Sequence, residues 1–286
     1  MSGTTRCSRM CSILLQNRGR NPYRQRPKQS FRRRYRRYTV LRVTVTARGF
    51  TNQQPSARRR IAYGTRPHNL FILPSRGRPQ NVARLIEHYS YTDAVAPVCL
   101  YVDTDDPKFS EYNALDLPNT WRFYLNSRAP YNPVWHINNN HFRIFPDEPW
   151  YGHINDDMVP RTYHWDQELI KSAGSDHIAY GDDMLQSRRM CTFPVIGGDL
   201  VRHFGRLMFP GLNIDSAWML LGYKLGLLRY RPDVRLEHMH YTVNKAPYDE
   251  TYNVPEEIRM GGSPEALEAF MREWILPARF NNEDRL

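Results

Sequence analysis

The sequence of 286 residues predicts an α/β fold, in which a mixed, mainly parallel sheet is flanked by helices. Short apolar runs of strand length alternate with segments whose apolar residues recur at helical spacing, and this alternation is typical of parallel sheets joined by helices. Acidic residues follow the ends of several expected strands. Because ligands of such sheets bind beyond the carboxyl ends of the strands, we expect a ligand site at that edge.

The first half of the expected sheet consists of apolar runs closed by turn residues. Residues 69–73 end at Pro74, and residues 98–102 end in the acidic turn 103–107. Between them, apolar residues at helical spacing predict a helix over 82–89. Further strands are expected at 120–125 and 150–154.

The second half continues the alternation. Helices are expected at 165–173 and 214–225, and strands at 177–181 and 234–238. A last helix is predicted with Ser263 as its N-cap and Pro264 at its first position. Its apolar face consists of Leu267, Phe270, Met271 and Trp274.

Charge divides the chain near residue 67. The formal net charge is +11, yet residues 1–67 contain 18 Lys and Arg and no Asp or Glu, which leaves a net charge of −7 on residues 68–286. The basic segment is rich in Arg, Gln, Asn, Pro and Ser, and such a composition buries too little apolar surface to offset its ordering entropy. We therefore expect a disordered basic arm (1–67) followed by one domain (68–286).

Three interpretations of the arm stay open. Arg side chains interleaved with Tyr can bind nucleic acid through counterion release at phosphates and stacking on bases. Blocks of like charge are also common in solvated tails that have no partner. The third interpretation is that the arm comes from an over-extended reading frame and contributes nothing.

Apolar segments and cysteines indicate the cellular setting. No run of 18 apolar residues is present, so no membrane span is predicted, and the apolar run at 13–15 is too short for a signal peptide. We expect a cytoplasmic protein. Cys7 and Cys11 have metal-like spacing but no partner pair, and Cys99 and Cys191 lie in apolar segments where free Cys packs as a small hydrophobe.

Clustered carboxylates and histidines carry the strongest functional signal. They are Asp156 and Asp157, Asp182 and Asp183, Asp215, His238 and His240. Carboxylates beside imidazoles indicate a site for a divalent cation such as Mn²⁺ or Mg²⁺. Hard ions of this kind complete their coordination with phosphate oxygens, which indicates a nucleotide-diphosphate substrate.

The order of these motifs resembles GT-A-type nucleotide-sugar glycosyltransferases, most nearly the family-2-like enzymes of bacteriophages and their actinobacterial hosts. The similar blocks are 73–79, 102–103, 155–162, 180–186, 210–222 and 230–240, within roughly residues 68–275. The resemblance implies a Rossmann-like GT-A fold and metal-dependent, hexosyltransferase-like transfer to a protein or glycan acceptor. For a phage-encoded chain, the compartment is the host cytoplasm.

The resemblance also implies roles on the donor side. Residues expected to bind the nucleotide sugar are Pro74, Arg76, Arg78, Asp103, Asp105 and Asp156. The segment 155–157 matches the metal-binding DxD-like motif with Asn at its first position, which places the metal chiefly on Asp157. The distal histidine ligand is His238 or His240, and we favour His240 because the strand is expected to end there.

Further roles implied by the resemblance have structural alternatives. Asp215 is expected to be the base of an inverting transfer, or else an acid stabilised by a helix N-terminus. Asp182 and Asp183 lie on the acceptor side or form a structural turn. Asp103 is a nucleoside ligand or a turn cap, and Arg76 and Arg78 bind diphosphate or lie on the surface.

Two other functions remain open. One is a nucleic-acid-binding or virion structural protein that uses the basic arm, and the other is a nucleotidyltransferase, which shares the fold and the metal chemistry. The net negative charge of residues 68–286 favours a cation and a diphosphate over a bound polyanion.

Overall fold

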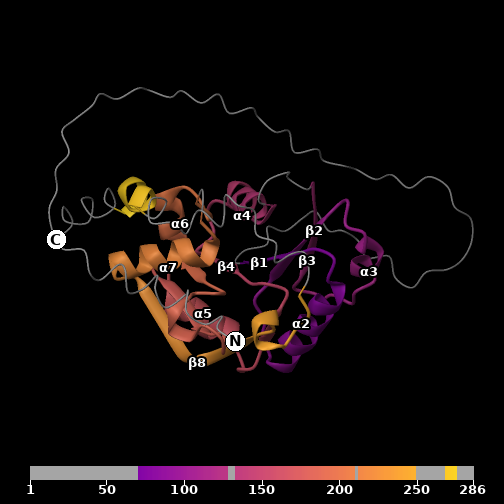
Figure 1. Cartoon of the computed structure of the whole chain (residues 1–286). Helices are drawn as coiled ribbons and strands as arrows, with labels where there is room; N and C mark the ends of the chain where they lie inside the picture. Colours follow the sequence, from indigo (N-terminus) through magenta and orange to yellow (C-terminus); the bar gives the residue numbers. More distant parts are fainter. Residues whose placement is uncertain (1–69, 128–132, 210–211, 249–267, 276–286) are drawn as a thin grey trace, which may run out of the picture. The chain divides into compact units, whose positions relative to one another are not determined.

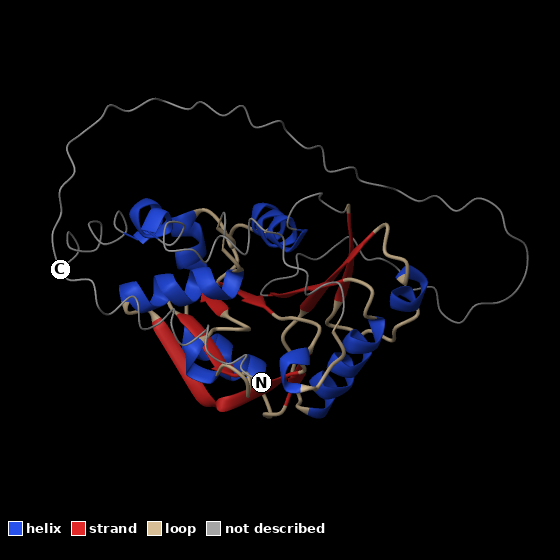
Figure 2. Cartoon of the chain, in the orientation of Figure 1, coloured by secondary structure: helices blue, strands red, loops and turns tan. Residues whose placement is uncertain are grey.

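A computed structural model describes residues 70–127, 133–209, 212–248 and 268–275. The expected basic arm, Cys7, Cys11 and the start of the last predicted helix at Ser263 lie outside these residues. Within them, strands and helices alternate along the chain as the sequence predicts (Figures 1 and 2).

The strands form one sheet of eight, in the order β3-β2-β1-β4-β7-β6-β8-β5. Their bounds are β1 Leu70–Ser75, β2 Val98–Asp103, β3 Arg122–Asn126, β4 Trp150–His153, β5 Met158–Pro160, β6 Ile178–Asp182, β7 Val195–Gly197 and β8 Leu228–His238. Four neighbouring pairs are parallel: β1 with β2, β1 with β4, β2 with β3, and β6 with β8. The pairs β4–β7, β6–β7 and β5–β8 are antiparallel. The expected mixed, mainly parallel sheet is confirmed.

Helices cover both faces of this sheet. They are α2 Pro79–Tyr91, α3 Phe109–Asn113, α4 Pro133–Ile144, α5 Trp165–Ala173, α6 Gly198–Phe204 and α7 Ile214–Leu225, with short helical turns η1 Ser187–Arg189, η2 Tyr241–Val243 and η4 Met271–Ile275. Side chains of β1 alternate between two cores: Leu70 and Ile72 pack with α4, α6 and α7, whereas Phe71 and Leu73 pack with α2 and α5. This alternation follows from the two-residue period of a strand.

The expected helices at 82–89 and 214–225 are present for the reasons predicted. Pro79 is at the first position of α2, and Val82, Leu85 and Tyr89 are buried along one side. Helix α7 ends at Gly226, whose φ of 73° is a left-handed conformation that glycine adopts without strain.

Among the described residues, helices α3, α4 and α6 and strands β5 and β7 were not predicted, and one strand begins earlier than predicted. Helix α4 contains three consecutive Asn, which are weak helix formers. Strand β7 and helix α6 are short and adjoin each other in the sequence, so neither shows a clear periodicity of apolar residues. Strand β8 begins at Leu228 rather than 234, although it contains Pro232. Its register with β6 shifts between Gly181 and Asp182, and an irregularity of this kind accommodates a proline that has no N–H to donate.

The end of the described chain packs on the core. Phe270 is buried, and its ring and that of Trp274 lie 5.1 and 5.2 Å from the ring of Phe209. The expected apolar face is confirmed for these two residues. Cys99 and Cys191 are buried free thiols, as their apolar surroundings predict. Among the described residues, no helix has the length and apolar character needed to cross a bilayer.

Candidate functional site

The sheet brings the acidic strand ends to one edge. Strands β1, β2 and β4 run in the same direction, and two successive antiparallel pairings through β7 make β6 and its parallel neighbour β8 run that way too. The carboxyl ends of these strands therefore share one edge. They supply Ser75 and Arg76, Asp103, residues 155–157, Asp182 and Asp183, and His238.

Arg76 connects the acidic residues at the end of β2. Its Nη1 atom lies 3.1 Å from Oδ2 of the buried Asp103 and 2.7 Å from Oδ1 of the exposed Asp105. The Asn126 side-chain amide donates to the other oxygen of Asp103, at 2.8 Å. Asp103 is therefore a buried carboxylate with a cation on one oxygen and an amide on the other.

Asp106 caps the acidic turn at residues 103–107. Its two carboxylate oxygens accept from the backbone N–H groups of Gly77 and Lys108, both at 2.8 Å. The turn-cap alternative considered for Asp103 thus describes Asp106 instead, because the Asp103 side chain is engaged by Arg76 and Asn126.

Asp156 is buried and connected to the end of β1. Its Oδ1 lies 2.9 Å from Arg78 Nη2, and its Oδ2 accepts from the Ser75 hydroxyl at 2.5 Å. Burial raises the pKa of Asp156, against the opposing effect of the Arg78 charge. Pro74, also expected at the donor site, lies half-buried within β1 directly before Ser75. Arg78 therefore pairs with the carboxylate of Asp156.

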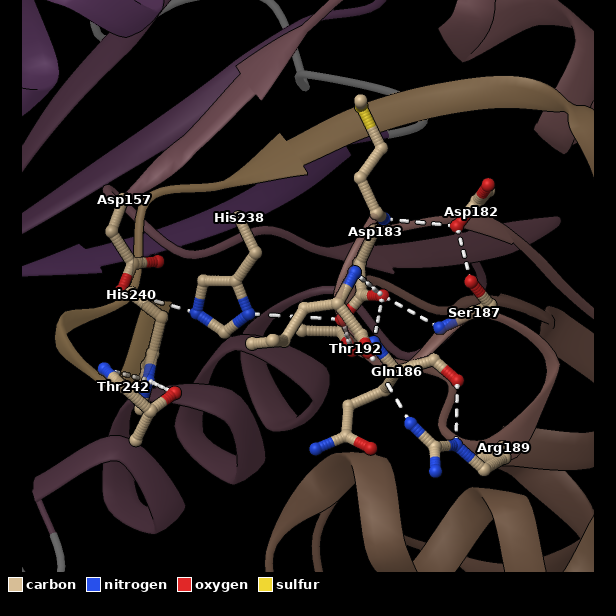
Figure 3. A network of polar contacts seen from close by, with 12 residues as sticks. Asp157, Asp182, Asp183, Gln186, Ser187, Arg189, Thr192, His238, His240 and Thr242 are labelled. Atoms are coloured by element: carbon tan, nitrogen blue, oxygen red, sulfur yellow. Dashed lines mark hydrogen bonds and ion pairs between the residues drawn. The ribbon is translucent and has the colours of Figure 1, made fainter. Parts of the chain in front are cut away.

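His238 lies between two carboxylates (Figure 3). Its Nε2 atom is 3.3 Å from Asp157 Oδ2, and its Nδ1 atom is 3.7 Å from Asp183 Oδ2. Burial alone would lower the pKa of His238, but its ion pairs with Asp157 and Asp183 outweigh burial and raise that pKa to about 9. Burial likewise opposes ionisation of Asp157, yet His238 outweighs it and lowers the pKa of Asp157. The three groups form a charged cluster.

His240 lies beside His238, with 5.0 Å between the ring centroids. Strand β8 ends at His238, as the predicted strand over 234–238 does, so His240 lies beyond the strand; Met239 N–H donates to Asp157 O next to the pairing of His238 with Met158. The Nδ1 atom of His240 contacts the Thr242 hydroxyl at 2.8 Å and caps η2. His238, rather than the favoured His240, makes the direct contact with Asp157.

The donor set around Asp157 fits a divalent cation that shares its coordination with a substrate. Oδ1 of Asp157 is buried and has no hydrogen-bond partner within the described ranges. Across these same ranges, no three His, Cys, Asp or Glu side chains are arranged as a ready ligand set. One unpartnered carboxylate oxygen suits Mg²⁺ or Mn²⁺, which commonly take one or two carboxylates together with phosphate oxygens and water. Protonated His238 offers no lone pair to such an ion.

Asp183 organises the turn that follows β6. Its Oδ1 accepts from the backbone N–H groups of Leu185, Gln186 and Ser187 at 3.0, 2.6 and 2.8 Å, and its Oδ2 accepts from the Thr192 hydroxyl at 2.8 Å. Burial opposes ionisation, but His238 and these donors outweigh it and lower the pKa of Asp183 to about 2. The turn alternative therefore describes Asp183.

Asp182 has a lesser part in the same turn. Its Oδ1 accepts from the backbone N–H of Met184 at 2.9 Å and from the Ser187 hydroxyl at 2.7 Å. Met184 and Ser187 have φ values of 58° and 50°. Because such values are uncommon for residues other than glycine, the two carboxylates stabilise a turn that would otherwise be unfavourable.

Asp215 is half-buried in the first turn of α7. Burial raises the pKa of its carboxyl, and Oδ1 accepts from Ser216 N–H at 2.7 Å. The Cys191 thiol donates to Asp215 O at 3.0 Å, while the adjacent Thr192 contacts Asp183. A continuous path of contacts thus runs from Asp157 through His238 and Asp183 to Asp215.

Several neutral residues of this site were not predicted. They are Ser75, Tyr112, Asn126, Cys191 and Thr192. Ser75 lies inside the motif at 73–79, which was the only available signal. Hydroxyl and amide side chains are common in turns, so their type alone indicates no site.

No family model matches this chain, and no curated protein matches it. Among solved structures it is similar to glucosyl-3-phosphoglycerate synthase from Mycobacterium tuberculosis in complex with Mn²⁺, uridine diphosphate and phosphoglyceric acid, at 11% identity over 68% of this chain and 76% of that chain, with a TM-score of 0.45. It is also similar to the galactosyltransferase LgtC with donor and acceptor sugar analogs, at 10% identity over 56% and 72% of the two chains, with a TM-score of 0.35. A mycobacterial protein matches at 8% identity over 65% and 70%, with a TM-score of 0.43.

Proposed function

We propose that residues 68–286 form a glycosyltransferase domain that transfers a sugar from a nucleotide-diphosphate sugar, with Mn²⁺ or Mg²⁺ bound chiefly by Asp157. The observation that carries the proposal is the buried, unpartnered Oδ1 of Asp157 at the edge where the carboxyl ends of β1, β2, β4, β6 and β8 meet. A carboxylate at this edge binds a diphosphate only through a cation, because two anions repel.

The donor is proposed to bind along the ends of β1 and β2. Asp103 and Asp105 offer acceptors for hydroxyl or base N–H groups of the nucleoside, and Asp156 contacts Ser75 and Arg78 after the end of β1. Guanidinium groups match phosphate geometry, so Arg76 and Arg78 would exchange a carboxylate for a diphosphate oxygen when the donor binds.

Asp215 is proposed as the base of the transfer. The acceptor hydroxyl oxygen attacks the sugar carbon, the bond from that carbon to the diphosphate oxygen breaks, and the hydroxyl proton moves to Asp215. A bound cation would offset the negative charge that develops on the leaving diphosphate. Burial raises the pKa of Asp215 and makes it a stronger base than an exposed carboxylate. The acceptor is proposed to be a hydroxyl group of a protein or glycan.

We expect the full chain to bind a nucleoside diphosphate only in the presence of Mn²⁺ or Mg²⁺. Asp157→Ala should abolish this binding, because it removes the carboxylate with the open oxygen. Isothermal titration calorimetry with uridine and guanosine diphosphate, with and without Mn²⁺, measures both effects. A matched control is Asp199→Ala, since Asp199 is an exposed acid paired with Arg202 on α6. Binding that needs no metal, or that survives Asp157→Ala, contradicts the metal assignment.

Deleting residues 1–66 is expected to leave folding and diphosphate binding unchanged. Every predicted site residue lies after that segment, and the two cores described above are built from residues 70 onward. Thermal melting and calorimetry of the truncated chain test this expectation. If the truncated chain unfolds, the domain boundary is wrong. If it folds but no longer binds, the arm contributes to the site.

A further inference from the structure

Three side chains connect helix α4 to the residue before the acidic pair. Asn138 on α4 and His153 at the end of β4 are buried, and Asn155 is half-buried. His153 Nδ1 lies 3.2 Å from Asn138 Oδ1, and His153 Nε2 lies 3.0 Å from Asn155 Oδ1. The imidazole is thus held between two amides.

The amide of Asn138 has a fixed direction. Its Nδ2 donates to Val134 O at 2.8 Å. Since a backbone carbonyl only accepts, turning this amide over would place two acceptors against each other. Asn138 Oδ1 therefore faces His153, and the Nδ1 atom of His153 must carry the proton that it accepts.

The remaining nitrogen of His153 is then an acceptor. Burial favours the uncharged ring and lowers the pKa of His153 to about 4, although its contact with Asn155 opposes this. A neutral imidazole has one donor and one acceptor, so with the proton on Nδ1 the Nε2 atom accepts. The Asn155 Oδ1 atom that lies against Nε2 would then face a second acceptor, so we infer that this amide is turned over and directs its NH₂ group to Nε2. The oxygen and nitrogen of an amide have nearly the same size, so either orientation fits the same space.

We propose that His153 is a positioning residue. Its Nδ1–H tautomer holds the Asn155 amide nitrogen against Nε2, so that the amide oxygen faces the edge formed by the carboxyl ends of the strands. There the oxygen accepts a hydrogen bond from a hydroxyl group of the nucleotide sugar. The ligand in this inference rests on the proposed function, whereas the tautomer does not. The same geometry explains why position 155 holds Asn where the resembling motif has Asp: a carboxylate offers no N–H to His153 Nε2.

The tautomer is tested without any ligand. Nitrogen-15 NMR of the full chain at neutral pH, with the His153 signals assigned by their loss in His153→Gln, reports which ring nitrogen carries hydrogen. We expect a protonated Nδ1 and an unprotonated Nε2. A protonated Nε2, whether in the other tautomer or in the imidazolium, overturns the proposal.

The positioning role is tested by replacing Asn138, which contacts Asn155 only through His153 in the series of contacts described above. Asn138→Leu keeps the number and branching of the side-chain heavy atoms but removes the acceptor that selects the tautomer. We expect affinity for uridine or guanosine diphosphate with Mn²⁺ to fall by about three- to tenfold, as for loss of one hydrogen bond, and His153 to lose its single tautomer. In turnover assays this variant should raise KM and leave kcat nearly unchanged.

Tyr101→Phe is the matched control. It removes a hydrogen bond of 2.7 Å between Tyr101 and His141, which is another buried contact of α4 with the sheet. This variant should lose stability but retain diphosphate affinity. If both variants lose affinity equally, or if Asn138→Leu loses none, the positioning role is wrong. If the wild-type chain binds neither diphosphate, the proposed function fails, and the NMR result alone decides the tautomer.

Discussion

Replacing Asp215 with Asn is expected to lower turnover by about a hundred- to ten-thousand-fold, which is the usual range for loss of a general base. Affinity for nucleoside diphosphate should stay near the wild-type value, because the contacts that join Asp215 to the charged cluster are indirect and run through Cys191, Thr192 and Asp183. Asn keeps the shape of the side chain but accepts no proton. Single-turnover kinetics with the natural acceptor, together with calorimetry, separate the two effects.

The pH profile gives an independent measure of the same group. A base must be deprotonated, so activity should fall as pH decreases through the pKa of Asp215, which burial raises above 3.8. This acid limb should vanish from the residual activity of Asp215→Asn.

Three outcomes decide the role of Asp215. Ser216→Ala, a control that removes only the neighbouring hydroxyl, should retain activity. Near-normal turnover of Asp215→Asn would show that Asp215 is only a helix-start acid. Equal loss of diphosphate binding would place it with Asp157 in the metal site.

The first half of the fold could be predicted because its central strands are buried on both faces. Strands β1 and β2 consist almost entirely of buried residues, so they appear as continuous apolar runs bounded by turn residues. Helix α4 could not be predicted in this way. Its Asn residues favour turns by propensity, and its stability comes from tertiary contacts such as Asn139 with the Leu207 and Met208 backbone.

The sequence identified the charged members of the site but not which of them pair with one another. Strand ends placed Asp157 and Asp183 at one edge, since that follows from local pattern and parallel topology. The position of His238 between them depends on the pairing of β8 with both β5 and β6. Pairing of strands far apart in the sequence leaves no local signal, so the choice between His238 and His240 needed the structure.

Asp183→Ala is expected to lower the free energy of unfolding by about 3–5 kcal/mol, as for a broken buried ion pair. Four donors lose their acceptor: three backbone N–H groups at 185–187 and the Thr192 hydroxyl. His238 is then left with Asp157 as its only carboxylate among those described here. Asp182→Ala is the matched control and should cost about 1 kcal/mol, because it removes hydrogen bonds from one exposed N–H and one hydroxyl. Urea denaturation of metal-free protein measures both.

The pH dependence distinguishes this structural role from an acceptor-binding one. The folded-state pKa of Asp183, about 2, lies below the ordinary 3.8, so its stabilisation is present above pH 3.8 and is lost as pH falls toward 2. The folded-state pKa of His238, about 9, lies above 6.5, so its stabilisation is present below pH 6.5 and is lost as pH rises through 9. Asp183→Ala should weaken both dependences, whereas Asp182→Ala should change neither. Equal destabilisation by the two variants, with unchanged pH profiles, would contradict the buried ion pair and return Asp183 to the acceptor side of the site.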